Sequence, residues 1–152
     1  MFEVLVFMFE NYFAHHTTPA NDVLTHELSA AGFAENDIFG AVSWFDEMKT
    51  MLNAPPSIYN HAHTGCRVFA TQEMSKISLE SLSFILFLQQ ASVINAIDRE
   101  LIIDRAMALK QDQIKIEEMR WITMIALWNA GREKDYLFVE DALFNPHGLT
   151  LH

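Results

Sequence analysis

The amino-acid sequence predicts an all-α protein of about seven helices, and two features of the chain lead to that prediction. Apolar residues recur at helical spacing along most of the chain, and turn residues separate these segments from one another. The strongest break signals lie in one stretch, residues 53–66, which leaves room for at most one short β-hairpin. Apolar residues make up 51% of the 152 residues and 12 are Phe, so we expect a large aromatic core or a core plus a buried partner surface.

Residues 2–14 fit an unusually apolar helix. Phe2 and Phe9 lie on its main apolar stripe, and only Glu3 and Glu10, seven residues apart, mark a narrow solvent side. By periodicity alone the run VLVFMF fits a buried strand equally well. A helix of this composition is either central to the core or part of an interface.

A second helix is expected after Thr18, which would act as the N-cap, with Pro19 at the first helical position. Gly32 is expected to end this helix in the left-handed conformation, and Phe33 to fold back on Leu28.

The third helix is predicted over residues 35–52, and within the break that follows, the sequences SIY and CRVF fit a hairpin near residues 57–69. Three helices followed by a hairpin is the order of a winged helix, so the N-terminal part is helix-turn-helix-like. We therefore expect an N-terminal lobe over residues 1–70 and a helical lobe over residues 71–152, joined in one compact unit.

The second half predicts four more helices, over residues 71–90, 95–110, 116–130 and 134–144. The segment FILFL is apolar on every side, so the helix around residues 79–90 is expected at the centre of the fold. Trp121 and Trp128 are seven residues apart on one helix face and are expected to be largely buried.

With these elements in place, the chain resembles the Smg family of short bacterial proteins over essentially its full length. The resemblance rests on several segments in the same order: MFEVLVFMFENY, LTHELSAAGFAENDIFGAVSWF, RVFATQEM, EEMRWITMIALWN, EDALF and the closing LH. It implies no activity or ligand, because none is established for the family, whose genes tend to lie beside genes for DNA-processing and topoisomerase proteins. Ala34 and Lys115 depart from the pattern, since a capping side chain is expected there, and each weakens a helix start by about 1 kcal/mol.

The helix-turn-helix order raises the question of DNA binding, and charge argues against it. The chain carries 20 acidic and 10 basic residues, a formal charge of −10. Projection of the third helix places Phe39, Ser43, Asp46 and Glu47 on its outward arc, where a DNA reader needs Arg, Lys, Asn or Gln. A winged-helix-like nucleic-acid-binding protein is therefore the alternative interpretation rather than the first.

The same four residues are candidates for contact with a protein. Phe39 would be the apolar anchor and the two acids would surround it, facing a basic, DNA-associated partner. The competing interpretation is that Phe39 packs inside against the first helix. The sequence thus favours a non-catalytic interaction or adaptor protein.

Metal binding is a weaker alternative. His61, His63 and Cys66 form an H-x-H-x-x-C cluster of zinc-ligand types, but no fourth ligand lies nearby in the sequence. The favoured interpretation is a loop that is rich in histidine, and no cofactor is expected. His15 and His16 fit the polar C-terminal end of the first helix.

An enzyme is equally disfavoured, because the chain lacks a nucleophile elbow, a phosphate-binding glycine loop, an H-E-x-x-H motif and a dinucleotide fingerprint. Glu117 and Glu118 are explained by the dipole at a helix start. The acids of residues 98–104, interleaved with Arg99 and Arg105, fit a solvated charged face.

Composition finally indicates a soluble, cytoplasmic protein. The single Cys66 cannot form an intramolecular disulfide, and residues 2–14 lack the basic start of a secretory signal. Residues 81–97 carry no charge, but seventeen residues interrupted by Gln89 and Gln90 fit a buried helix better than a membrane span. Self-association is left open.

Overall fold

The computed structural model describes residues 1–15, 17, 19–54 and 67–132, together with positions 134, 135, 137, 138 and 141. Over these residues the protein is all-α, with seven α-helices, one 3₁₀ turn and no strand, which confirms the predicted fold class. The helices are α1 (Phe2–Asn11), α2 (Asn21–Ala30), α3 (Glu35–Leu52), α4 (Thr71–Lys76), α5 (Leu79–Gln90), α6 (Ala96–Met107) and α7 (Ile116–Asn129), and the 3₁₀ turn is η1 (Phe13–His15).

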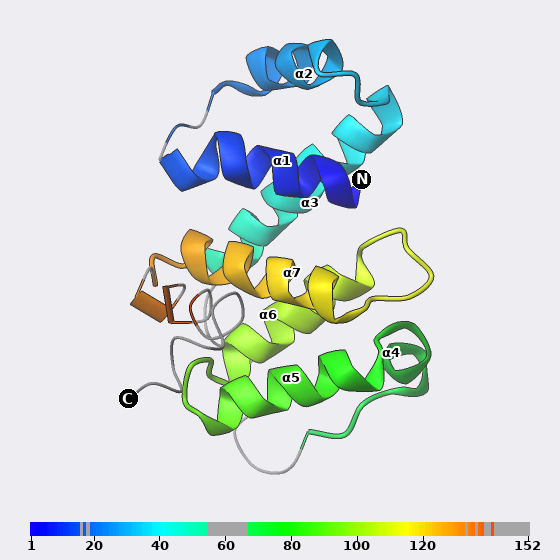
Figure 1. Ribbon diagram of the computed structural model, residues 1–152, viewed down its shortest axis with the longest axis vertical. Helices are drawn as coiled ribbons and strands as arrows, with labels where there is room; N and C mark the ends of the chain where they lie inside the picture. The colour runs from blue at the N-terminus through cyan, green and yellow to red at the C-terminus, as the bar shows by residue number, and fades with distance from the viewer. Residues whose placement is uncertain are drawn as a thin grey trace.

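The N-terminal helices α1, α2 and α3 occupy one end of the molecule, and α5, α6 and α7 form the other (Figure 1). Helix α3 runs from the first group into the second, where it packs on α6, and α1 packs on α7. One hydrophobic cluster contains buried residues from both groups, including Phe9, Phe45, Ile102 and Ile125. The expected boundary at residue 70 lies in the coil just before α4.

Helix α1 follows its sequence pattern closely. Val4, Leu5, Met8 and Phe9 are buried, whereas Glu3 and Glu10 are exposed. The predicted helix over residues 2–14 ends early, because the chain turns at Tyr12 and continues as η1. His15 is exposed at the end of this turn, and His16 lies outside the described residues.

Helix α2 starts later than predicted and ends where predicted. Its first residue is Asn21 and its N-cap is Ala20, so the expected helical position of Pro19 is wrong. At the other end Gly32 has φ +96°, and the Phe33 amide donates to the Leu28 carbonyl at 3.3 Å. This is the expected glycine-terminated cap.

The predicted helix over residues 71–90 is in fact two helices. It breaks at Ile77, which forms an isolated parallel bridge with Ile114, a residue far away in the sequence. The Ile114 amide donates to the Lys76 carbonyl, and the Ser78 amide donates to the Ile114 carbonyl. Ser78 then caps α5 by accepting a hydrogen bond from the Ser81 amide. The tertiary partner and this local cap together stop one helix and start the next.

Helix α7, rather than α5, is the most deeply buried helix. Six consecutive residues, 122–127, are buried, and α7 packs against α1, α5 and α6. The prediction that the helix over residues 79–90 is central was wrong: Leu79 and Phe87 are exposed on its outer side. An apolar sequence permits burial on all sides but does not ensure that neighbours cover all sides.

The tryptophans differ in burial. Trp44 is 2% exposed, whereas Trp121 and Trp128 are partly buried and pack against the core. Trp128 nonetheless donates its indole N–H to the Phe13 carbonyl at 2.9 Å, and its ring meets the Phe9 ring edge-on. It therefore ties α7 to the end of α1.

Several predictions concern residues that the structure does not describe. The hairpin near residues 57–69 lies almost wholly outside the described residues, and its described end, residues 67–69, is not strand. Of the helix predicted over residues 134–144, only isolated positions are described. No helix in the described ranges is long and apolar enough to span a membrane.

Candidate protein-interaction face

Helix α3 has one buried face and one outward face, divided as the sequence predicts. Ile38, Ala41, Trp44, Phe45 and Met48 are buried. On the other side Phe39, Asp46 and Glu47 are exposed and Ser43 is half-buried. We call Phe39, Ser43, Asp46 and Glu47 the α3 face.

Phe39 is the clearest feature of the α3 face. Its side chain is 75% exposed, although its neighbour Ile38 is 2% exposed. The alternative that Phe39 packs inside against the first helix is therefore wrong. A large aromatic side chain left in water forfeits roughly the 1.5–3 kcal/mol that its burial would contribute.

The two acids of the α3 face differ in their environment. Asp46 is exposed, whereas the Glu47 carboxylate pairs with Arg105 of α6 at 2.9 Å. The Arg105 side chain is only 6% exposed, and it also pairs with Asp104 at 2.7 Å. Arg105 thus fixes the position of the Glu47 carboxylate, whereas Asp46 remains exposed to solvent.

Arg105 belongs to a reciprocal contact between α3 and α6. Its guanidinium donates to the Trp44 carbonyl at 3.2 Å and lies 5.8 Å from the Trp44 ring centre. In return, the Trp44 indole N–H donates to the Arg105 carbonyl at 2.9 Å. A buried arginine of this kind is tolerated because carboxylate and carbonyl oxygens satisfy its N–H groups.

The expectation that Arg99 and Arg105 belong to a solvated charged face is therefore wrong. Both are buried, and Arg99 bonds to Gln89 at 3.0 Å and to Glu100 at 2.9 Å. Glu100 also accepts from Arg67 at 2.8 Å, so it connects two arginines. The sequence contained one usable signal, since Arg99 and Arg105 flank the apolar run LII on a helix that must bury one face.

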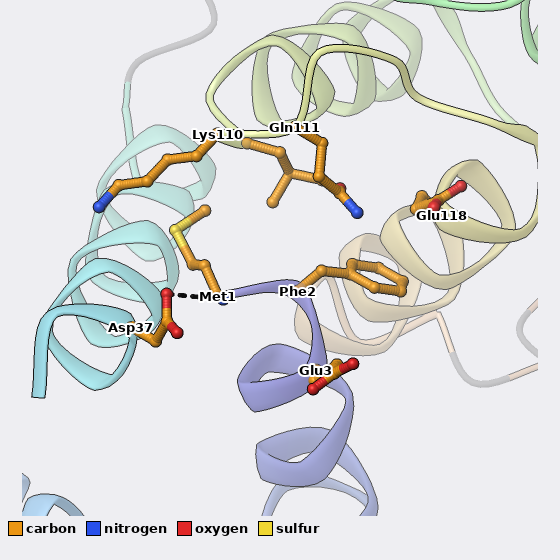
Figure 2. Close-up of a pocket in the computed structure, with 8 residues that line it drawn as sticks. Met1, Phe2, Glu3, Asp37, Lys110, Gln111 and Glu118 are labelled. Carbon is orange, nitrogen blue, oxygen red and sulfur yellow. Dashed lines mark ion pairs between the residues drawn. The ribbon is translucent and has the colours of Figure 1, made fainter. Parts of the chain in front are cut away.

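A pocket of about 430 Å³ adjoins the first turn of α3 at Asp37 (Figure 2). Its lining comes from the start of α1, from Asp37, from residues 109–111 and from Glu118 of α7. The Met1 amine pairs with Asp37 at 2.9 Å, which anchors the start of α1 to α3. A Cβ at Gly40 would lie 2.8 Å from the Met1 sulfur, so glycine permits this close approach.

The titratable side chains of the pocket are mostly acidic. Its titratable side chains are Glu3, Asp37, Lys110 and Glu118, without a serine, cysteine or histidine among the lining residues. Glu118 accepts the Lys115 amide at 3.0 Å, and Glu117 is exposed beside it, as expected for acids in the first turn of α7. The Gln111 Oε1 atom is buried without a hydrogen-bond partner among the described residues.

The candidate zinc ligands His61, His63 and Cys66 fall outside the part of the chain that the structure describes. Among the residues that the structure does describe, no group of three His, Cys, Asp or Glu side chains is placed to hold a metal ion.

The comparisons with known proteins agree on one family. A family model described as "Protein of unknown function (DUF494)" matches residues 1–152. The chain is 48% identical over 152 residues to a protein named Protein Smg homolog from Methylobacillus flagellatus, with both chains covered in full. It is 36% identical over 157 residues to the Smg homolog of Shewanella woodyi, covering 100% of this chain and 99% of that one. No solved structure matches the chain. The protein therefore belongs to the Smg family, also described as DUF494.

Proposed function

We propose that this protein is a non-catalytic adaptor that binds a basic protein partner through the α3 face. The observation that carries the proposal is Phe39, a phenylalanine that is 75% exposed on the outward side of α3. Interfaces concentrate binding energy in a few aromatic or arginine side chains surrounded by weaker polar contacts. Phe39 has that position, with Ser43 and Asp46 along the same outward side.

Charge determines the kind of partner. The chain has a formal charge of −10, and the exposed acids of α3 lie where a partner would approach. Complementary charge raises the association rate and suppresses wrong partners. A basic protein surface fits best, and the gene neighbourhood of the family favours a DNA-associated protein. A cytoplasmic location accords with the single Cys66.

The pairing of Glu47 with Arg105 gives this face a fixed geometry. A carboxylate already held at 2.9 Å by a buried guanidinium loses little conformational freedom on binding. The Glu47 side chain is nevertheless 62% exposed, so a partner can reach it. We therefore propose that Glu47 makes a direct contact with the partner from a fixed position, and that Asp46 mainly raises the rate of association.

Direct DNA reading is the alternative, and the α3 face disfavours it. Base edges in the major groove are read mainly by Arg, Lys, Asn and Gln, and the outward positions 39, 43, 46 and 47 hold none of these. Two outward carboxylates would instead repel phosphate. A metal-binding or enzymatic role is the second alternative, and among the described residues no group of three His, Cys, Asp or Glu side chains is placed to hold a metal ion.

Site-specific crosslinking in living cells tests the proposal. A photoreactive phenylalanine analogue replaces Phe39 in one protein and Val23 of α2, itself 47% exposed, in a matched control. We expect crosslinks from position 39 to one basic protein, unchanged by nuclease, and none at position 23. Crosslinks from position 39 to nucleic acid only, or equal yields at both positions, would overturn the proposal.

Kinetics with the captured partner then assign the roles within the face. Phe39→Ala is expected to speed dissociation about 30-fold, the equivalent of the ~2 kcal/mol that defines a hot spot. Asp46→Lys is expected mainly to slow association, with a weaker salt dependence. Because Phe39 is exposed, its truncation should change the free energy of unfolding by less than about 0.5 kcal/mol, so the binding result is interpretable.

A further inference from the structure

A second surface, on the opposite end of the molecule from α1 and α2, carries exposed apolar residues. Helix α5 buries Leu82, Phe84, Ile85 and Leu88 against the core. Its outer side leaves Leu79 78% exposed and Phe87 60% exposed, with Leu86 at 36%. A monomeric protein rarely leaves several large apolar side chains on one helix in water without a function for them.

The outer residues of α5 are arranged symmetrically along the helix. Leu79, Ser83 and Phe87 are spaced four residues apart, so they form one stripe. Ser83 is exposed at the centre, and a large apolar residue lies one turn away on each side. The stripe therefore has the same pattern when read in either direction.

Charge makes a second copy of this chain the fitting occupant. Two molecules with a formal charge of −10 repel each other wherever acidic surfaces meet. Residues 81–97, which include most of α5, carry no charge at all. The only charged residue of α5 is Glu80, exposed in its first turn. Two copies that meet antiparallel about Ser83 set each Glu80 opposite Leu86 of the other copy, so they place no like charges in direct contact.

We infer that this protein forms a two-fold symmetric dimer in which α5 of one copy packs antiparallel on α5 of the other. Ser83 lies on the two-fold axis, and Leu79 of each copy packs on Phe87 of the second copy. Isologous contacts of this kind are the commonest in homo-oligomers, and a small central residue permits helix axes about 8–10 Å apart. The dimer leaves the α3 face free and does not depend on the proposed function.

Disulfide trapping tests the register directly. In a Cys66→Ala background, Ser83→Cys would place two thiols at the axis, within the ~4.4–6.8 Å Cα separation that a disulfide needs. The matched control is Ser29→Cys, which replaces an exposed serine on α2. Under oxygen with a copper–phenanthroline catalyst, we expect crosslinked dimer from Ser83→Cys at least about tenfold faster than from the control. Equal rates would overturn the inference.

Equilibrium sedimentation gives the independent test. We expect concentration-dependent dimerisation of the wild-type protein, and a dissociation constant at least about 30-fold weaker in Phe87→Glu, because the symmetric interface loses that contact twice. Val23→Glu, with a similarly exposed apolar residue on α2, should dimerise like the wild type. A monomeric wild type at ~100 µM would refute the dimer. At a concentration where both proteins are monomeric, a Phe87→Glu variant that melts well below the wild type would show instead that the chain itself covers this side.

Discussion

At the scale of single residues, much of what matters in this fold is set by contacts that the sequence does not display. Arg105 and Trp44 are 61 positions apart, yet each satisfies a polar group of the other. Periodicity correctly placed Phe39 outside and Phe45 inside, because that distinction depends only on the angle around one helix. Periodicity could not predict that Arg105 is buried, because an arginine is buried only where a second element supplies hydrogen-bond acceptors.

Ser92 gives a residue-scale prediction. It has φ +60°, in the left-handed region, and ends α5 in the way that Gly32 and Gly131 end α2 and α7. A residue with a Cβ is strained there by about 1–2 kcal/mol, whereas glycine is not. Ser92→Gly should therefore raise the free energy of unfolding, by up to about 1 kcal/mol after the greater chain entropy of glycine is subtracted.

Denaturant unfolding measures this change, and Ala91→Gly provides the control. Ala91 has φ −77°, where glycine relieves no strain, so that variant should be no more stable than the wild type. Stabilisation by Ala91→Gly, or none by Ser92→Gly, would contradict the explanation.

At the scale of elements, the helices that were predicted best are those whose ends are marked locally. Asn95 and Asp98 cap α6 reciprocally at 2.9 Å, and Gly32 ends α2. The break between α4 and α5 was missed, because Ile114 supplies the interrupting hydrogen bonds from far along the chain. The burial of α5 was overestimated for a related reason: hydrophobicity does not reveal how many neighbours a helix has.

The start of α4 gives a pH prediction. Arg67 donates to Glu73 at 2.8 Å and holds the pKa of that carboxyl below its usual value, and the Ala70 amide at 2.9 Å acts in the same direction. A carboxyl whose pKa is lower in the folded state stabilises the fold above its unfolded pKa. This contribution is lost as pH falls through the folded pKa.

Glu73→Gln should therefore be less stable than the wild type at pH 7, and the difference should shrink as the pH is lowered below about 4.5. Melting curves of both proteins over a pH series measure it. Glu80→Gln, an exposed acid in the first turn of α5, is the control and should show a smaller difference. If the melting temperatures of wild type and Glu73→Gln differ by the same amount at every pH, the effect comes from packing and not from charge.

At the scale of the whole molecule, the two ends are joined by side chains that each belong to both. Trp44 of α3 contacts Arg105 of α6, and Trp128 of α7 donates to the Phe13 carbonyl beyond α1. The sequence offered only a boundary near residue 70 and the expectation that the two lobes form one unit. Which helices cross between them depends on packing, and no local pattern encodes it.

These crossing contacts predict that the protein unfolds in one cooperative transition. The described core is one cluster in which Phe9 of α1 packs against Trp121 and Trp128 of α7, and Trp44 of α3 donates to Arg105 of α6, so neither end can melt without exposing apolar surface of the other. Tryptophan fluorescence reports on both ends, and far-ultraviolet circular dichroism reports on all helices, so their urea midpoints should coincide. Trp44→Phe keeps an aromatic ring but removes the hydrogen bond to the Arg105 carbonyl. It should lower both midpoints together and reduce the free energy of unfolding by about 1 kcal/mol or more, because a buried carbonyl loses its partner. Two separate transitions, with Trp44→Phe shifting only one of them, would show instead that the lobes before and after residue 70 fold independently.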